Sequence, residues 1–125
     1  MSTKETLNYD KLQVEVDKKV NELHEADPKL KKVFPIVVEG EEYDEKPYYI
    51  AYFKQPSFVS FSKFMTFSQK DQVVALKELA KECFLDGDKD LINDESLFMF
   101  GLMPHLSQLI EVRKGKIVNL SKAGK

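Results

Sequence analysis

The stretch Cys83-Phe-Leu-Asp-Gly-Asp-Lys-Asp-Leu-Ile-Asn-Asp-Glu-Ser96 places aspartates at alternate positions, and two interpretations fit such a run. An EF-hand calcium loop needs oxygen ligands at its positions 1, 3 and 5, a glycine at position 6 and a bidentate glutamate at position 12. Counted from Asp86, the glycine position holds Leu91 and the glutamate position holds Leu97. Because half of the ligand set is absent, the sequence favours a turn between two helices over a calcium site.

A turn gives each residue of the run an ordinary structural role. Gly87 supplies the left-handed backbone just past a helix, and short aspartate side chains bind nearby backbone amides. Asn93 or Asp94 then caps the free amides at the start of the next helix. We therefore predict that this segment joins two helices and holds no metal ion.

The segment from Tyr9 to Ala26 has the period of an amphipathic helix, which Asp27-Pro28 ends. Its apolar residues recur every three or four positions, so they lie on one stripe with lysines and glutamates opposite. The stripe consists of Tyr9, Leu12, Val16, Val20 and Leu23.

Two segments rich in β-branched and aromatic residues follow, Val33–Glu39 and Tyr48–Lys54, joined by a polar, acidic connection. An antiparallel hairpin of two short strands is the simplest account of this pattern. Pro35 indicates that the first strand lies at an edge, because proline has no N–H to donate to a ladder.

Helical patterns fill the region after Pro56. A first helix follows Ser57, because Phe58, Phe61, Phe64 and Met65 recur at helical spacing. Ser68 with Asp71 resembles a capping box, which predicts a second helix that reaches about Leu85.

A third helix opens at Asn93 or Asp94 and continues to Ile110. Pro104 should kink it or split it in two, because proline disrupts the interior of a helix. The segment Val112–Leu120 fits either a small hairpin or an extension of this helix, and local sequence does not decide between them.

Length and composition define the fold class. A chain of 125 residues suits one domain, and 32% charged with 42% hydrophobic residues is typical of a folded protein in water. We expect a single α+β domain over residues 1–125, mainly helical, with three to four helices and a small antiparallel β-hairpin. The ends, 1–8 and 121–125, are expected to be flexible.

The composition also argues against several classes of function. No apolar run reaches the roughly 18 residues that cross a bilayer, and the first residues have no hydrophobic signal segment, so we expect a cytoplasmic protein without membrane contact. A lone cysteine, Cys83, excludes an internal disulfide and a multi-thiolate zinc site. The single arginine, Arg113, argues against nucleic-acid binding, since arginine is the usual phosphate and guanine contact.

No set of side chains is typical of catalysis. Cys83 lies in the apolar stripe of its predicted helix, which favours an inert buried thiol. The two histidines, His24 and His105, are far apart in the sequence, and His105 is expected to be a partly buried packing residue. Glycine-rich phosphate loops and Ser/His/Asp arrangements are not found. We predict no catalytic residue, no cofactor and no metal site, and therefore not an enzyme.

Aromatic residues are concentrated in one region: nine of the fourteen fall between Tyr43 and Phe67. Alternate residues of a strand point to opposite faces, so a two-stranded sheet cannot bury both faces under one helical layer. Two hypotheses remain open. Either a small core simply uses large side chains, or surplus apolar surface binds a partner protein or a second copy of the chain.

Four pieces of sequence come in a characteristic order. The first is a short strand with a basic residue before proline, Tyr52-Phe-Lys-Gln-Pro-Ser57, and the second is the end of a helix at a cysteine followed by an acidic glycine turn, Cys83-Phe-Leu-Asp-Gly-Asp88. The third is an acidic cap before an apolar helix, Asn93-Asp-Glu-Ser-Leu-Phe98. The fourth is a basic ending, Leu109-Ile-Glu-Val-Arg113. In order and spacing, the chain from Val33 to Leu120 resembles the small tail assembly chaperones of long-tailed bacteriophages and prophages. The phenylalanine-rich segment 58–67 and Pro104 depart from that pattern.

The resemblance implies a non-catalytic protein of the host-cell cytoplasm. It would bind the tape measure protein, keep the long hydrophobic helices of that protein in solution, and recruit tail tube protein during assembly. Flexible methionines and aromatic rings suit contacts with varied helices. The side chains expected to bind the partner are Phe58, Phe61, Phe64, Met65, Phe98, Met99 and Met103.

Self-association is a further hypothesis. The acidic connection Glu39–Glu45 and the basic C-terminus would pair head to tail between subunits of a homo-oligomer. The alternatives from other classes are a structural virion subunit of the tail or connector, and a calcium-binding regulatory module.

Overall fold

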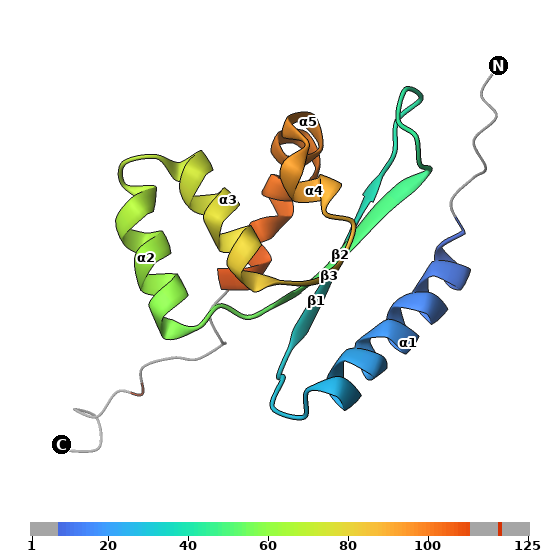
Figure 1. Cartoon of the computed structure of the whole chain (residues 1–125), viewed down its shortest axis with the longest axis horizontal. Helices are drawn as coiled ribbons and strands as arrows, with labels where there is room; N and C mark the ends of the chain where they lie inside the picture. The colour runs from blue at the N-terminus through green and yellow to red at the C-terminus, as the bar shows by residue number, and fades with distance from the viewer. Residues whose placement is uncertain (1–7, 111–117, 119–125) are drawn as a thin grey trace.

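The computed structural model describes residues 8–110 and Val118, and its centre is a three-stranded antiparallel sheet with helices on both sides (Figure 1). The strands are β1 (Val33–Glu39), β2 (Tyr48–Lys54) and β3 (Phe84–Gly87), in that spatial order. β1 and β2 form the predicted hairpin, paired from Val33 opposite Lys54 to Glu39 opposite Tyr48. β1 is an edge strand of this sheet, as Pro35 indicated.

β3 was not predicted, because it lies inside the run interpreted as an inter-helix turn. The preceding helix ends at Cys83 rather than near Leu85, and the chain then pairs at once with β2. Gly87 has a φ of 119°, and a Cβ there would lie 2.4 Å from the carbonyl oxygen of Ile50. Glycine is therefore required at this position for its backbone and for its size. The prediction of a left-handed glycine is confirmed, but at the end of a strand.

α1 (Tyr9–Ala26) lies along one face of the sheet (Figure 1). Its buried residues Leu12 and Val16 pack with Tyr52 of β2. Half-buried side chains complete this small second core: Val20, Leu23, Val33, Val37, Tyr48, Ile50 and Leu85. A helix of the chain itself thus covers the face that a single helical layer would leave bare, and this accounts for part of the aromatic surplus.

The remaining helices lie on the other face, over the larger core. They are α2 (Phe58–Ser68), α3 (Gln72–Cys83), the short α4 (Asp90–Asn93), and a helical stretch made of α5 (Glu95–Leu97), η1 (Phe98–Leu102) and η2 (Met103–Ile110). The largest fully buried side chains come from β2, α3, α4 and this last stretch: Phe53, Leu79, Cys83, Leu91, Phe98, Leu102, Leu106 and Leu109. The mainly helical α+β fold expected from the sequence is confirmed.

The predicted N-terminal cap is found for α5 but not for α3. Asp94 caps α5, since its Oδ1 accepts a hydrogen bond from the Leu97 amide at 3.0 Å. The capping box at Ser68 is wrong: Ser68 is the last residue of α2, and Asp71 itself caps α3 by accepting from the Val74 amide at 3.1 Å.

The stretch from α5 to η2 changes its hydrogen-bond pattern along its length. It is a π-helix over η1 and a 3₁₀-helix over η2, with Pro104 at the second position of η2. The break predicted at Pro104 takes this form, since proline lacks the N–H that a continuous α-helix requires. The open question at Val112–Leu120 and the expected flexible ends fall outside the described residues, apart from Asn8 and Val118.

Candidate functional site

Asp86 and Asp88, two aspartates of the run between α3 and α5, form ion pairs or hydrogen bonds with other groups of this chain. Lys19 of α1 lies 2.5 Å from Asp86, and Lys46 lies 2.5 Å from Oδ1 of Asp88. The Ile50 amide donates to Oδ2 of Asp88 at 2.9 Å. The hydrogen bond from Lys19 is the main cause that lowers the pKa of Asp86. These carboxylates tie α1 and the β1–β2 connection to the sheet.

Two kinds of chemically reactive side chain can be placed in the described residues: potential metal ligands and the thiol of Cys83. Among residues 8–110 and 118, no group of three or more His, Cys, Asp or Glu side chains is placed to hold a metal ion. Cys83 is 1% exposed, and burial raises the pKa of its thiol to about 11. The thiolate is therefore scarce at neutral pH.

The histidines lie on different elements. His24 of α1 lies near the start of β1, with Nε2 2.6 Å from the carbonyl oxygen of Lys31. His105 is exposed, so the prediction of a partly buried packing residue is wrong. The inward positions of η2 are taken by Leu106 and Leu109, which leaves His105 on the outer side.

Exposed apolar side chains gather on α2 and on the first turn of α3. Six of the eleven large hydrophobic residues exposed in the described part of the chain lie there: Phe58 (84%), Val59 (64%), Met65 (49%), Phe67 (53%), Val73 (38%) and Val74 (43%). We call these six residues the α2–α3 surface. Of the eleven residues of α2, only Phe64 is buried, and Lys63 carries the only charge. α2 thus has more apolar surface than its own packing uses.

The seven side chains predicted to bind a partner are divided by the fold. Phe58 and Met65 are exposed on α2, whereas Phe64 and Phe98 belong to the larger core. The other three, Phe61, Met99 and Met103, are half-buried.

The predicted set omits four members of the α2–α3 surface, namely Val59, Phe67, Val73 and Val74. One signal for two of them was available in the sequence. Six of the eleven residues of α2 are large and apolar, more than one side of a short helix can bury, so some of those off the core stripe are exposed.

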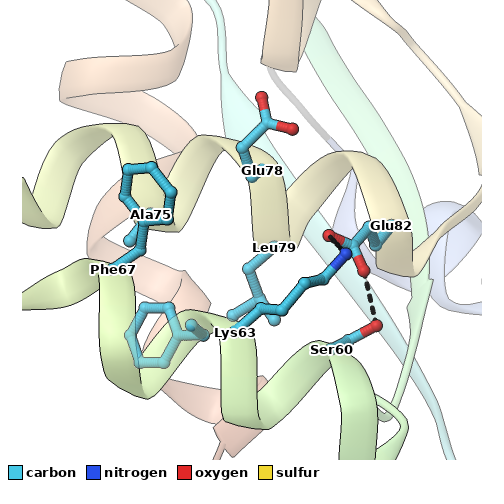
Figure 2. A pocket seen from close by; sticks show the side chains of 8 residues that line it. Ser60, Lys63, Phe67, Ala75, Glu78, Leu79 and Glu82 are labelled. Atoms are coloured by element: carbon cyan, nitrogen blue, oxygen red, sulfur yellow. Dashed lines mark hydrogen bonds and ion pairs between the residues drawn. The ribbon is translucent and has the colours of Figure 1, made fainter.

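A pocket of about 140 Å³ opens between α2 and α3 (Figure 2). Apolar side chains line it from both helices, together with four polar residues: Phe64, Phe67, Ala75 and Leu79, and Ser60, Lys63, Glu78 and Glu82. Phe67 is at once a lining residue and part of the α2–α3 surface. The pocket is therefore continuous with that surface.

Polar contacts at the pocket connect its two helices. Ser60 Oγ donates to Glu82 Oε1 at 2.6 Å, and Lys63 Nζ lies 3.3 Å from Glu82 Oε2 (Figure 2). The serine first, and then the lysine, lower the pKa of Glu82. A general base works best with a pKa near the working pH, so this carboxylate is a poor activator of the serine. The group links α2 to α3.

Comparisons with known proteins bear on the fold. No family model matches the chain, and no curated protein matches it. A solved structure of an uncharacterised protein from Bacillus stearothermophilus is similar, with a TM-score of 0.53 and 20% identity over 80% of this chain and 99% of that chain. At this identity the similarity shows a shared fold alone. Separately, none of the described helices has the length and apolar character needed to cross a bilayer.

Proposed function

We propose that this chain is a tail assembly chaperone of a bacteriophage or prophage, a non-catalytic protein that acts in the host-cell cytoplasm. The observation that carries the proposal is α2, which buries one side chain and exposes Phe58 and Met65, 84% and 49% accessible. Apolar patches on a protein surface mark binding sites for other chains. The resemblance in sequence between Val33 and Leu120 supports the tape measure protein as the partner.

The proposed binding mode is that of a helix laid against the α2–α3 surface. Amphipathic helices bind by placing apolar residues of successive turns against such a surface. Phe58 and Met65 lie seven positions apart on α2, so they fall on one stripe of the helix. Met65 adapts its shape because its side chain is unbranched and flexible. The surface would thereby shield apolar helices of the tape measure protein from aggregation until tail tube protein assembles around them.

Co-expression with the tape measure protein of the same phage or prophage tests the proposal. We expect the two proteins to co-purify in soluble form. A double variant, Phe58→Asp with Met65→Asp, should abolish the complex while its melting temperature stays within a few degrees of the wild type, because both side chains are exposed. Val14→Asp is the control for placing an aspartate at an exposed apolar position elsewhere, since Val14 is 68% exposed on α1. A complex that survives the double variant would contradict the proposal.

A structural virion subunit is the second candidate. Phe100 of η1 is 82% exposed and is not part of the α2–α3 surface, and two separate apolar contacts suit a subunit packed between neighbours. Mass spectrometry of purified particles separates the two functions. A chaperone is missing from mature virions, whereas a structural subunit is present in stoichiometric amount.

Self-association through charge is a further proposal. The β1–β2 connection holds Glu41, Glu42 and Glu45, all exposed, and the C-terminal sequence is basic. Opposite charges on different parts of a subunit allow head-to-tail pairing, which salt weakens. Sedimentation at two salt concentrations should show oligomers that dissociate as salt rises, and an unchanged monomer at low salt would contradict the proposal.

A further inference from the structure

The pocket between α2 and α3 has the size of one bulky side chain. Its volume is about 140 Å³, close to the roughly 150 Å³ of an apolar cavity known to bind benzene. Its apolar lining comes from Phe64 and Phe67 on one helix and Ala75 and Leu79 on the other. Such a pocket at the edge of an apolar surface suits a single anchoring residue, because binding energy concentrates where one side chain fills a well-packed recess.

The two glutamates that line the pocket, Glu78 and Glu82, differ in their contacts. Glu82 is already bound by Ser60 and Lys63. The Glu78 carboxylate points away from this pair in Figure 2, and its side chain is 57% exposed. Its contact with Lys81 spans 3.4 Å, and exposed pairs of this kind are weak. A cation brought by a partner can therefore replace Lys81 at Glu78 with little loss.

We propose that this pocket receives one aromatic or leucine side chain from an amphipathic helix of the partner, and that a lysine or arginine one turn away on that helix pairs with Glu78. Residues three or four positions apart share a helix face, so one helix can present both groups to the pocket. The inference rests on the proposed function, and it adds the sequence pattern that the bound helix must show.

A displayed library of 20-residue amphipathic helices, selected on the full chain, provides the test. We expect the selected helices to share a phenylalanine, leucine or tyrosine with a lysine or arginine three or four positions away. An acidic residue in that place, or failure to select any helix, would overturn the inference.

Two substitutions then locate the contact by measured affinity. Glu78→Lys should weaken binding of a selected helix about three- to tenfold, and exchanging the basic residue of the helix for glutamate should restore it. Glu25→Lys is the matched control, because Glu25 is exposed on α1 and makes the same change of net charge. Equal losses from the two variants would show a non-specific charge effect and overturn the pairing with Glu78.

The pocket itself is tested by filling it and by opening it. Ala75→Leu should reduce affinity at least about tenfold by occupying the recess. Ala75 is 2% exposed, so the larger side chain also strains α3; Phe67→Ala, at a residue 53% exposed, removes one wall without that strain and should weaken binding as well. If Phe58→Asp abolishes binding and neither pocket variant weakens it, the pocket inference fails and the proposed function stands. If Phe58→Asp also has no effect, both fail.

Discussion

α1 and α2 lie on opposite sides of the molecule and use their apolar residues in different ways (Figure 1). α1 directs Leu12 and Val16 onto the sheet and keeps lysines and glutamates outside. α2 buries Phe64 and leaves Phe58 84% exposed. Burial in the fold therefore accounts for Leu12 and Val16 of α1, but not for Phe58 of α2. This difference favours the proposed division of roles, in which α1 stabilises the fold and α2 binds the partner.

The largest effect is expected from Phe64→Ala, which removes the one buried side chain of α2. Phenylalanine-to-alanine changes in a core cost about 3–5 kcal/mol of unfolding free energy. Because α2 packs on α3 through this residue, partner binding should fall as well. Denaturant unfolding and a binding titration measure the two effects. A loss below about 1 kcal/mol would show that Phe64 does not hold α2 in place.

Leu12→Ala should separate the two roles. Leu12 lies on the side of α1 that faces the sheet and is 6% exposed. Leucine-to-alanine changes in a core cost about 2–5 kcal/mol of unfolding free energy, and we expect the low end here because the second core is small. Partner affinity should stay unchanged at temperatures where the variant is folded. Denaturant unfolding and a binding titration measure the two effects. A loss of affinity in the folded variant would mean that α1 takes part in binding.

The pKa of Tyr52 depends on the burial of this side chain, which packs against α1. Burial first, and then the nearby charge of Glu15, raise the pKa of Tyr52 to about 12 from an ordinary value near 10. The folded state thus holds this proton more tightly, so its contribution to stability is complete below pH 10 and is lost as the pH rises towards 12. Unfolding measured between pH 9 and 12 should show this decline, and Tyr52→Phe should make it smaller. An equal decline in that variant would assign the effect to other groups.

Lys19→Met should have the smallest effect. The Lys19–Asp86 pair is partly exposed, with side chains 34% and 48% accessible, and such pairs contribute below about 1 kcal/mol. Because Lys19 lowers the pKa of Asp86, the contribution is present above the ordinary carboxyl pKa and is lost as the pH falls through the lowered value. Acid unfolding of the two proteins should therefore converge at low pH, and a difference that persists there would contradict this assignment.

The sequence predicted those elements whose signal is local and long. The bounds expected for α1, β1 and β2 agree with the structure, because each has many residues in one clear period. β3 was missed because it has four residues, follows α3 without a turn and gains its pairing from β2, more than thirty positions earlier. Which helix covers which face of the sheet depends on the assembled chain and not on any single segment.

The candidate surface was predictable only in part. Helical spacing placed Phe58 and Phe64 in one helix, but it did not distinguish the exposed residue from the buried one. That distinction comes from the direction in which α3 packs on α2. The pocket was beyond prediction for the same reason, since its lining joins residues of two helices, such as Phe64 and Leu79.

The proposed binding through α2 can be measured by NMR, from the shifts of the backbone amides when a purified segment of the tape measure protein is added. We expect the perturbed amides to lie in α2 and the first turn of α3, including Phe58, Met65 and Val74, and those of α1 to stay unchanged. Perturbations confined to α1 or to the β1–β2 connection, with α2 unaffected, would contradict it.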